Sequence, residues 1–337
     1  MMAKKEVSSY DLFLRATEFA AILAAATRGH GVKSWTDFNA VWGMRCMLDE
    51  LPMRGEFVSS EGALDNSSRF GYGERIGAGK DGGVFDLAVD PIDGTELCAS
   101  GQEGAISVLA AAPKDSLLRA EETYMWKLAC GAKAKGAICL QKSPTQNILD
   151  VADALGKKPG QLTVAILKRK RHEDLIKEIR ATGAMVKLLE AGDLMPAIST
   201  AYDGRVDLMM GAGGGPEGVI AGAALYCLGG DFCGRLDKEL TEKEMGKKLD
   251  FKVDDRHLKL KDIVQDGVHT VCVTAVTDAY FLEGVRWRDG RVSTNTLALR
   301  GGAATVELSQ KTRDLSQHNW REYILPECLS LEKFKKR

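Results

Sequence analysis

The chain has 337 residues, of which 45% are hydrophobic and 28% charged, and its net charge is −1 at neutral pH. This composition is typical of a globular protein with one large or two ordinary domains, and it gives no reason to expect nucleic acid or an anionic membrane as a partner. No segment approaches the roughly 20 consecutive apolar residues of a membrane-spanning helix, and no secretory signal is recognisable. We therefore expect a cytoplasmic protein.

The first 160 residues mix helix and strand patterns. Apolar residues recur at helical spacing from Tyr10 to Thr27, with Asp11 as a plausible N-cap, and a second helix is predicted from Thr36 to Leu51. Strand patterns follow in RGEFVSSEG, GGVFDLAVD and GAISVLAAAP. These segments predict an α+β lobe over residues 1–160.

From residue 161 onward, strand and helix patterns alternate. Strands are predicted in LTVAILK, MVKLL and VDLMM, and helices in HEDLIKEIRATG, AGDLMPAISTAY and the segment after GAGGGPEG. This alternation favours an α/β lobe with a parallel sheet over residues 161–337. Within it, the charged segment from Leu240 to Asp262 is expected to be an insertion or an exposed excursion, and antiparallel strands with a hairpin turn at Asp289 and Gly290 are expected after it.

The most specific stretch is VDPIDGTE, from Val89 to Glu96, at the end of a predicted strand. Two carboxylates on one tight turn repel each other unless a cation lies between them, and oxygen ligands of this kind suit magnesium or manganese. The glycine allows a turn that a side chain would forbid, and free N–H groups beyond it suit a phosphate. The residue types favour metal-assisted hydrolysis of a phosphate ester, although an aspartate that only forms a turn remains an alternative.

Other carboxylates could complete such a site. Glu61 and Asp65 stand in SSEGALD, Asp37 follows Lys33 in KSWTDFN, and Glu217 opens a predicted helix. Each also has an ordinary explanation: a helix cap, a solvated loop charge, or a charge that complements a helix dipole.

VDPIDGT, together with SSEG, YMWKLACG and GAGGGPEGV, resembles the class II (GlpX-type) fructose-1,6-bisphosphatases. The similarity extends from about Tyr10 to about Gly302. DPIDGT is shared with the wider lithium-sensitive phosphatase superfamily, whereas the GGxPEG turn selects class II. The resemblance implies a layered α/β/α/β/α sandwich with one largely antiparallel and one largely parallel sheet, and a site between the lobes.

The resemblance also implies roles for individual residues. It implies Mn²⁺ or Mg²⁺ bound by Asp37, Glu61, Asp90, Asp93 and Glu217. It implies that Asp65 and Thr95 help to activate the attacking water, with Lys33, Gly94 and Thr95 close to the same phosphate.

A basic turn in LKRKRHEDL could be simply solvated, or it could hold a second phosphate, because arginine binds phosphate bidentately. The resemblance points to the second role for Arg169, Lys170 and Arg171. It implies further substrate contacts at Tyr124, Gly192, Asp193 and Gly214.

Two departures from the family pattern bear on specificity. Asp93 stands where the family usually has glutamate, which could change metal spacing or preference. Ala191 stands where it usually has aspartate, which removes one expected hydroxyl contact and could change the sugar preference.

The function implied is metal-dependent removal of the 1-phosphate from fructose 1,6-bisphosphate in gluconeogenesis, with sedoheptulose 1,7-bisphosphate as a second possible substrate. Two alternatives are an inositol- or nucleotide-type monophosphatase, which the basic turn disfavours, and a non-catalytic sugar-phosphate sensor, which the pair Asp65 and Thr95 disfavours. Relatives of this type are homo-oligomers, so a dimer or tetramer is expected.

Overall fold

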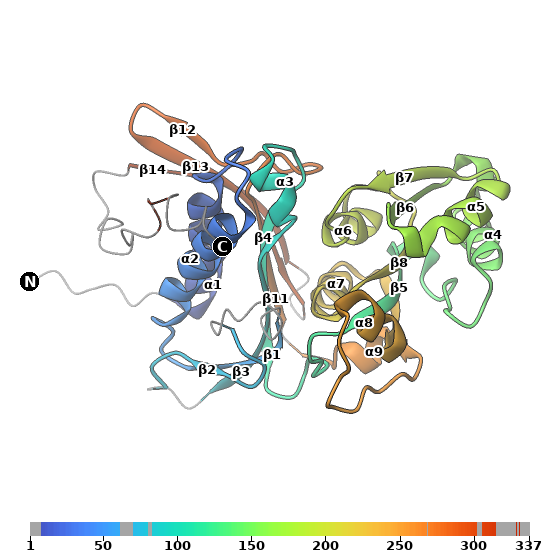
Figure 1. Ribbon diagram of the computed structural model, residues 1–337, viewed down its shortest axis with the longest axis horizontal. Helices are drawn as coiled ribbons and strands as arrows, with labels where there is room; N and C mark the ends of the chain where they lie inside the picture. Colours follow the sequence, from blue (N-terminus) through green and yellow to red (C-terminus); the bar gives the residue numbers. More distant parts are fainter. Residues whose placement is uncertain are drawn as a thin grey trace, which may run out of the picture.

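The computed structural model describes residues 8–60, 70–79, 83–267, 269–301, 305–314, 328 and 330. These residues form five layers (Figure 1). Helices α1 and α2 cover one face of a large sheet, α6 and α7 lie between this sheet and a second one, and α4 and α5 cover the far face of the second sheet. The predicted layered α/β sandwich is confirmed.

The larger sheet has eight strands in the described residues, in the order β12-β13-β11-β4-β3-β1-β2, with β14 paired to β13. Only β1 and β3 pair in parallel, so the sheet is largely antiparallel as expected. Its strands are β1 (Arg54–Ser60), β2 (Arg75–Ile76), β3 (Val84–Asp93), β4 (Ile106–Pro113), β11 (Thr270–Ala275), β12 (Arg286–Arg288), β13 (Arg291–Arg300) and β14 (Thr305–Asp314). Asp289 and Gly290 form the predicted hairpin turn between β12 and β13, both with positive φ.

In the described part of the chain, the second sheet has six strands in the order β10-β9-β5-β8-β6-β7. They are β5 (Tyr124–Cys130), β6 (Thr163–Leu167), β7 (Met185–Leu189), β8 (Leu208–Gly214), β9 (Asp231–Asp237) and β10 (Leu258–Lys259). The expectation of a largely parallel sheet holds only for β7, β6 and β8. Strand β5 enters between β8 and β9 and runs antiparallel to both, because it comes from outside the alternating strand–helix segment.

The helices are α1 (Ser9–Ala25), α2 (Lys33–Leu48), α3 (Thr95–Ala99), α4 (Pro144–Ala154), α5 (Glu173–Ala181), α6 (Leu194–Tyr202), α7 (Gly215–Leu228), α8 (Lys238–Met245) and α9 (Leu260–Ile263). Ser8, rather than Asp11, is the N-cap of α1, since its hydroxyl accepts a hydrogen bond from the Asp11 N–H. Helix α2 begins at Lys33, one turn earlier than expected. No helix in the described ranges combines the length and apolarity needed to cross a lipid bilayer.

The chain passes between the lobes at two places. It leaves the larger sheet after β4 and enters the second with β5, and it returns with β11. The first lobe therefore combines the N-terminal segment with β11 to β14, and the second lobe lies between them. A single boundary at residue 160 does not describe this arrangement, because a strand pattern says nothing about which sheet the strand joins.

The charged segment from Leu240 to Asp262 is also part of the second lobe and is not an exposed excursion. It folds into most of α8, β10 and α9, and Leu258 and Leu260 in it are buried. Helix α7 is apolar on all sides because it is packed between the two sheets. The GGGPEG turn at its N-terminus lies close to the end of β3, where Asp90 is found.

Candidate active site

Asp90 and Asp93 lie at the end of β3, where the strand bulges. Asp90 pairs with Val108 and Asp93 with Ile106 on β4, so two residues of β3 lie opposite one residue of β4 between these pairs. The Ile92 N–H donates to Asp90 Oδ1 at 3.0 Å, which fixes this carboxylate on the turn. Both aspartates are buried. The bulge therefore presents two carboxylates at the edge of the sheet, as DPID predicts.

Gly94 and Thr95 connect this bulge to α3. Gly94 has a φ of 86°, in the left-handed region that favours glycine, and it is the N-cap of the helix. The Thr95 hydroxyl donates to Ile92 O at 3.0 Å, so its oxygen keeps lone pairs that could accept a hydrogen bond. Thr95 is thus compatible with the expected contact to the attacking water.

The carboxylates around the bulge influence one another strongly. Burial, followed by the charges of Asp93, Glu217 and Asp37, raises the pKa of Asp90 well above its usual range. Asp37 lies half-buried in α2, within electrostatic reach of Asp90. Four of the five predicted metal ligands are therefore neighbours in space, although they come from three separate parts of the chain.

Asp93 faces the second lobe. Burial, followed by the charges of Asp193 and Glu217, raises the pKa of the Asp93 carboxyl to about 8, while Lys127 and a hydrogen bond from the Leu194 N–H lower it. Gly192 has a φ of 74°, and a methyl group there would lie 3.1 Å from Asp93 Oδ2. A glycine in the predicted sugar loop thus lets the backbone approach a carboxylate of the other lobe.

Glu217 lies in the first turn of α7 and is buried. Its Oε2 atom has no hydrogen-bond partner among the described residues. Gly214 precedes the helix, and a Cβ atom at this position would lie 1.9 Å from that oxygen. The GGGPEG turn therefore holds a buried carboxylate oxygen without a protein donor, as an oxygen ligand of a cation would be held.

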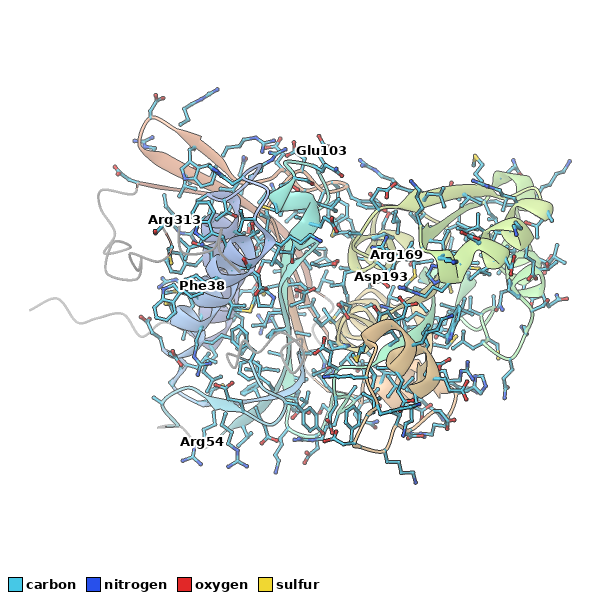
Figure 2. The ribbon with its side chains drawn as sticks, in the orientation of Figure 1. Phe38, Arg54, Glu103, Arg169, Asp193 and Arg313 are labelled. Carbon is cyan, nitrogen blue, oxygen red and sulfur yellow. The ribbon has the colours of Figure 1, made fainter. Side chains whose placement is uncertain are left out.

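A cavity of about 470 Å³ adjoins these groups. Figure 2 shows Arg169 and Asp193 near one another in the second lobe, and both line this cavity. Its charged lining residues have both signs: acidic Asp93, Glu122, Asp193, Glu217 and Glu244, and basic Arg169, Arg171 and Lys247. Tyr124, Gly192 and Gly214 also line it, so most predicted substrate contacts meet in one space.

The three residues of the predicted basic clamp have different environments. Arg169 is half-buried and lines the cavity, whereas Lys170 is exposed and is not part of the lining. Arg171 lines it too, but its guanidinium donates to Ala212 O and Glu244 and lies over the Tyr124 ring, with the centroid 4.9 Å away. Arg169 is thus the arginine best placed to bind a ligand, and Arg171 is largely committed to protein contacts.

Lys33 lies on the first turn of α2 and forms an ion pair of 2.8 Å with Glu96 of α3. Both side chains are exposed, and the Arg169 charge also acts on Glu96. Lys33 therefore stands at the rim, on the side where the two lobes face each other.

The donor set fits a hard divalent cation, but it is not a preassembled cage. Within the described ranges, no three acidic, histidine or cysteine side chains converge closely enough to hold a metal ion. Glu61 and Asp65 lie outside the described residues. What fits is the chemistry: buried oxygen donors, an unpartnered Glu217 oxygen, and mutual repulsion that a cation would offset.

Several residues that line the cavity or lie beneath it were missed by sequence reasoning. Lys247 and Glu244 lie in the charged segment that was expected to be an excursion. Lys127 is fully buried on β5, and its ammonium lies 2.6 Å from Asp193. Only the YMWKL motif in the resemblance gave any signal for it, since a lysine in a strand usually faces solvent.

The family of the chain follows from comparison with known proteins. Residues 9–313 match the family model described as bacterial fructose-1,6-bisphosphatase, glpX-encoded. The chain belongs to this family. The suspected resemblance is confirmed, and the match covers both lobes of the structure.

Individual relatives cover almost all of the chain. A protein named fructose-1,6-bisphosphatase class 2 from Haemophilus influenzae is 39% identical over 313 residues, which are 88% of this chain and 93% of the relative. Fructose-1,6-bisphosphatase 1 class 2 from Escherichia coli K12 is 35% identical, covering 90% and 95%. A relative from Synechococcus sp. strain JA-3-3Ab, named D-fructose 1,6-bisphosphatase class 2/sedoheptulose 1,7-bisphosphatase, is 36% identical, covering 87% and 92%.

Proposed function

We propose that this chain is a phosphoric monoester hydrolase that cleaves the 1-phosphate from fructose 1,6-bisphosphate, giving fructose 6-phosphate and inorganic phosphate. Membership of the bacterial fructose-1,6-bisphosphatase family and the names of its relatives support this reaction. A role in gluconeogenesis would follow from the product.

One observation carries the proposal at the level of the site. The buried carboxylates of Asp93 and Glu217 line the same cavity as Arg169. A bisphosphate needs both kinds of group, because one phosphate reacts beside cations held by carboxylates while the other must be held away from them. A monophosphate would leave the arginine without a ligand.

We propose that Asp37, Glu61, Asp90, Asp93 and Glu217 hold Mn²⁺ or Mg²⁺. The bound cations would neutralise charge on the phosphoryl oxygens and favour deprotonation of the attacking water. We further propose that Asp65 and Thr95 orient this water, and that Thr95, Gly94 and Lys33 lie beside the reacting phosphate.

The second lobe would bind the rest of the substrate. Arg169 would donate hydrogen bonds to the second phosphate, with Lys170 adding charge from the surface and Arg171 keeping Tyr124 in place. The Asp193 carboxylate would accept a hydrogen bond from a sugar hydroxyl. Gly192 and Gly214 have no side chain to block the approach of the sugar.

A second substrate, sedoheptulose 1,7-bisphosphate, is favoured by the space beside the site. A further cavity of about 280 Å³ is lined by Asp93 and Gly192, as the first cavity is, and also by Ala191 and Tyr280. The small side chain of Ala191 leaves room at the point where the two cavities adjoin. A seven-carbon sugar could extend there.

The experiment that tests the function measures phosphate release by the purified protein with and without Mn²⁺ or Mg²⁺. Fructose 1,6-bisphosphate, sedoheptulose 1,7-bisphosphate and inositol 1-phosphate are compared, with Asp90→Asn as the inactive control. We expect metal-dependent release from the bisphosphates only. Release from inositol 1-phosphate alone would favour the monophosphatase alternative, and binding without turnover would favour the sensor.

We also propose a cytoplasmic homo-oligomer, a dimer or tetramer, on the strength of the resemblance. Light scattering of the eluted protein gives the mass in solution, and a value near 36.5 kDa would contradict the oligomer.

A further inference from the structure

Lys127 is a buried charge in the centre of the second lobe. Its side chain is 1% exposed, and it lies on β5 between β8 and β9. A lysine is almost never fully buried unless its ammonium group is paired, because an unpaired buried charge is costly. Its partners therefore indicate what this lysine does.

The partners of Lys127 come from two helix starts at the cavity. The ammonium lies 2.6 Å from Asp193 Oδ2, at the N-cap of α6, and donates to Gly214 O at 3.0 Å, at the N-cap of α7. One side chain thus fixes two backbone segments that line the cavity. Lys127 itself is not among the lining residues, so it acts from beneath the cavity floor.

Gly213 and Gly218 leave room for the contact between Lys127 and Asp193. A Cβ atom at Gly213 would lie 2.3 Å from Asp193 Oδ2 and 3.0 Å from Lys127 Nζ, so a side chain there would separate the pair. A Cβ atom at Gly218 would lie 3.4 Å from the Lys127 Cδ atom. The close packing leaves the ammonium one position, between its two acceptors.

The charge of Lys127 also matters to the carboxylates. Asp193 is buried, and its charge acts directly on Asp93 across the lobe boundary. Without the ammonium, Asp193 would be a buried carboxylate with no cation beside it, and the charge of Asp93 would repel it. The Asp193 side chain would then turn away, and it would no longer present an acceptor to the cavity.

We propose that Lys127 is a positioning residue for the sugar: it holds the Asp193 carboxylate and the Gly214 carbonyl in the arrangement that binds the substrate hydroxyls. The inference rests on the proposed function, and it assigns Lys127 no contact with phosphate, metal or water. Lys127 acts through Asp193, so removing either residue should have the same effect on substrate binding.

A double-mutant cycle tests this coupling. The variants are Lys127→Met, Asp193→Asn and the double variant, and each is measured for KM and kcat with fructose 1,6-bisphosphate and for thermal unfolding. We expect each single variant to raise KM by about tenfold or more, the range of a lost charge-assisted hydrogen bond, with a smaller change in kcat. The double variant should match the single variants in KM rather than multiply their effects.

Thermal unfolding separates positioning from a merely structural role. Lys127→Met should lower the Tm, because it leaves Asp193 unpaired, and the double variant should recover part of the loss, because no buried charge is left alone. KM should not recover with it. The matched control is Lys157→Met, which removes the partner of Asp207 away from the cavity and should leave KM unchanged.

The outcomes separate this inference from the proposed function. Wild-type turnover with an unchanged KM in Lys127→Met, or with KM effects that multiply in the double variant, would overturn the positioning role alone. A wild-type protein that neither hydrolyses nor binds fructose 1,6-bisphosphate, the latter measured by calorimetry, would remove the proposed function and this inference with it.

Discussion

A Cβ atom at position 214 would lie 1.9 Å from Glu217 Oε2. Since Glu217 is buried and this oxygen has no other described partner, the carboxylate cannot keep its place beside any residue but glycine. The glycine turn before α7 thus sets the position of a proposed metal ligand three residues later.

Gly214→Ala should displace Glu217 while leaving the fold intact. We expect kcat/KM for fructose 1,6-bisphosphate to fall by about 100-fold, the cost of misplacing a group at the reacting centre by roughly 1 Å. Gly160→Ala is the matched control, because a Cβ atom there meets only Gly183 O, at 3.5 Å. Equal activity of the two variants in a phosphate-release assay would contradict the role given to the turn.

Asp93→Asn should weaken metal binding. The variant keeps the size of the side chain but removes one negative charge from the group that also contains Asp90 and Glu217. The affinity for Mn²⁺ should therefore fall by about tenfold or more. Calorimetric titration of the metal-free protein with Mn²⁺ measures this directly. Asp115→Asn, in an exposed loop, serves as the control and should bind like the wild type. An unchanged affinity in Asp93→Asn would exclude Asp93 as a ligand.

Arg169 and Lys170 should differ in their effect on substrate binding. Arg169 lines the cavity and Lys170 does not, although the two are adjacent in a basic turn. Arg169→Ala should raise KM by about 10- to 100-fold, as expected for lost hydrogen bonds to a charged group, and Lys170→Ala by about threefold or less. The comparison is a steady-state titration at fixed metal concentration. A larger effect for Lys170 would mean that the second phosphate lies outside the cavity.

His172 should make stability depend on pH. Burial, with the charges of Arg171 and Arg169, lowers its pKa below the usual value of about 6.5, although the hydrogen bond to Leu167 O and the charge of Asp193 oppose this shift. The Ala212 N–H donates to its Nε2 at 2.8 Å, so Nδ1 carries the proton and donates to Leu167 O. The folded state therefore holds a neutral ring.

Because unfolding lets His172 take up a proton below pH of about 6.5, its contribution to stability is present above that pH and is lost as the pH falls. Urea unfolding between about pH 5 and 7.5 should show this slope, and the slope should be shallower in His172→Gln. His257→Gln, which removes an exposed histidine, should keep the wild-type slope. Identical slopes in all three proteins would refute the assignment.

Local patterns predicted the strand end at Asp90 and the turns at Gly94 and Gly214, because these depend on residues that are close in sequence. The same patterns could not predict that β5 enters between β8 and β9, since pairing depends on packing across the whole lobe. The domain boundary at residue 160 and the largely parallel second sheet failed for this one reason.

Lys127 was missed for a related reason. Alternation along β5 places Met125 and Lys127 on one face, and a charge at such a position usually marks the solvent side. Its burial makes sense only beside Asp193, which is far along the chain and reaches it through the start of another helix. Local sequence patterns do not indicate that Lys127 and Asp193 form an ion pair.

The path of the chain between the lobes has a consequence for synthesis on the ribosome. Residues 124–263, which form the second lobe, are one continuous segment, whereas the larger sheet lacks β11 and its neighbours until the last part of the chain emerges. The second lobe can therefore fold first, while the edge of β4 that pairs with β11 is still unpaired. This edge of β4 is completed only when the last part of the chain has emerged.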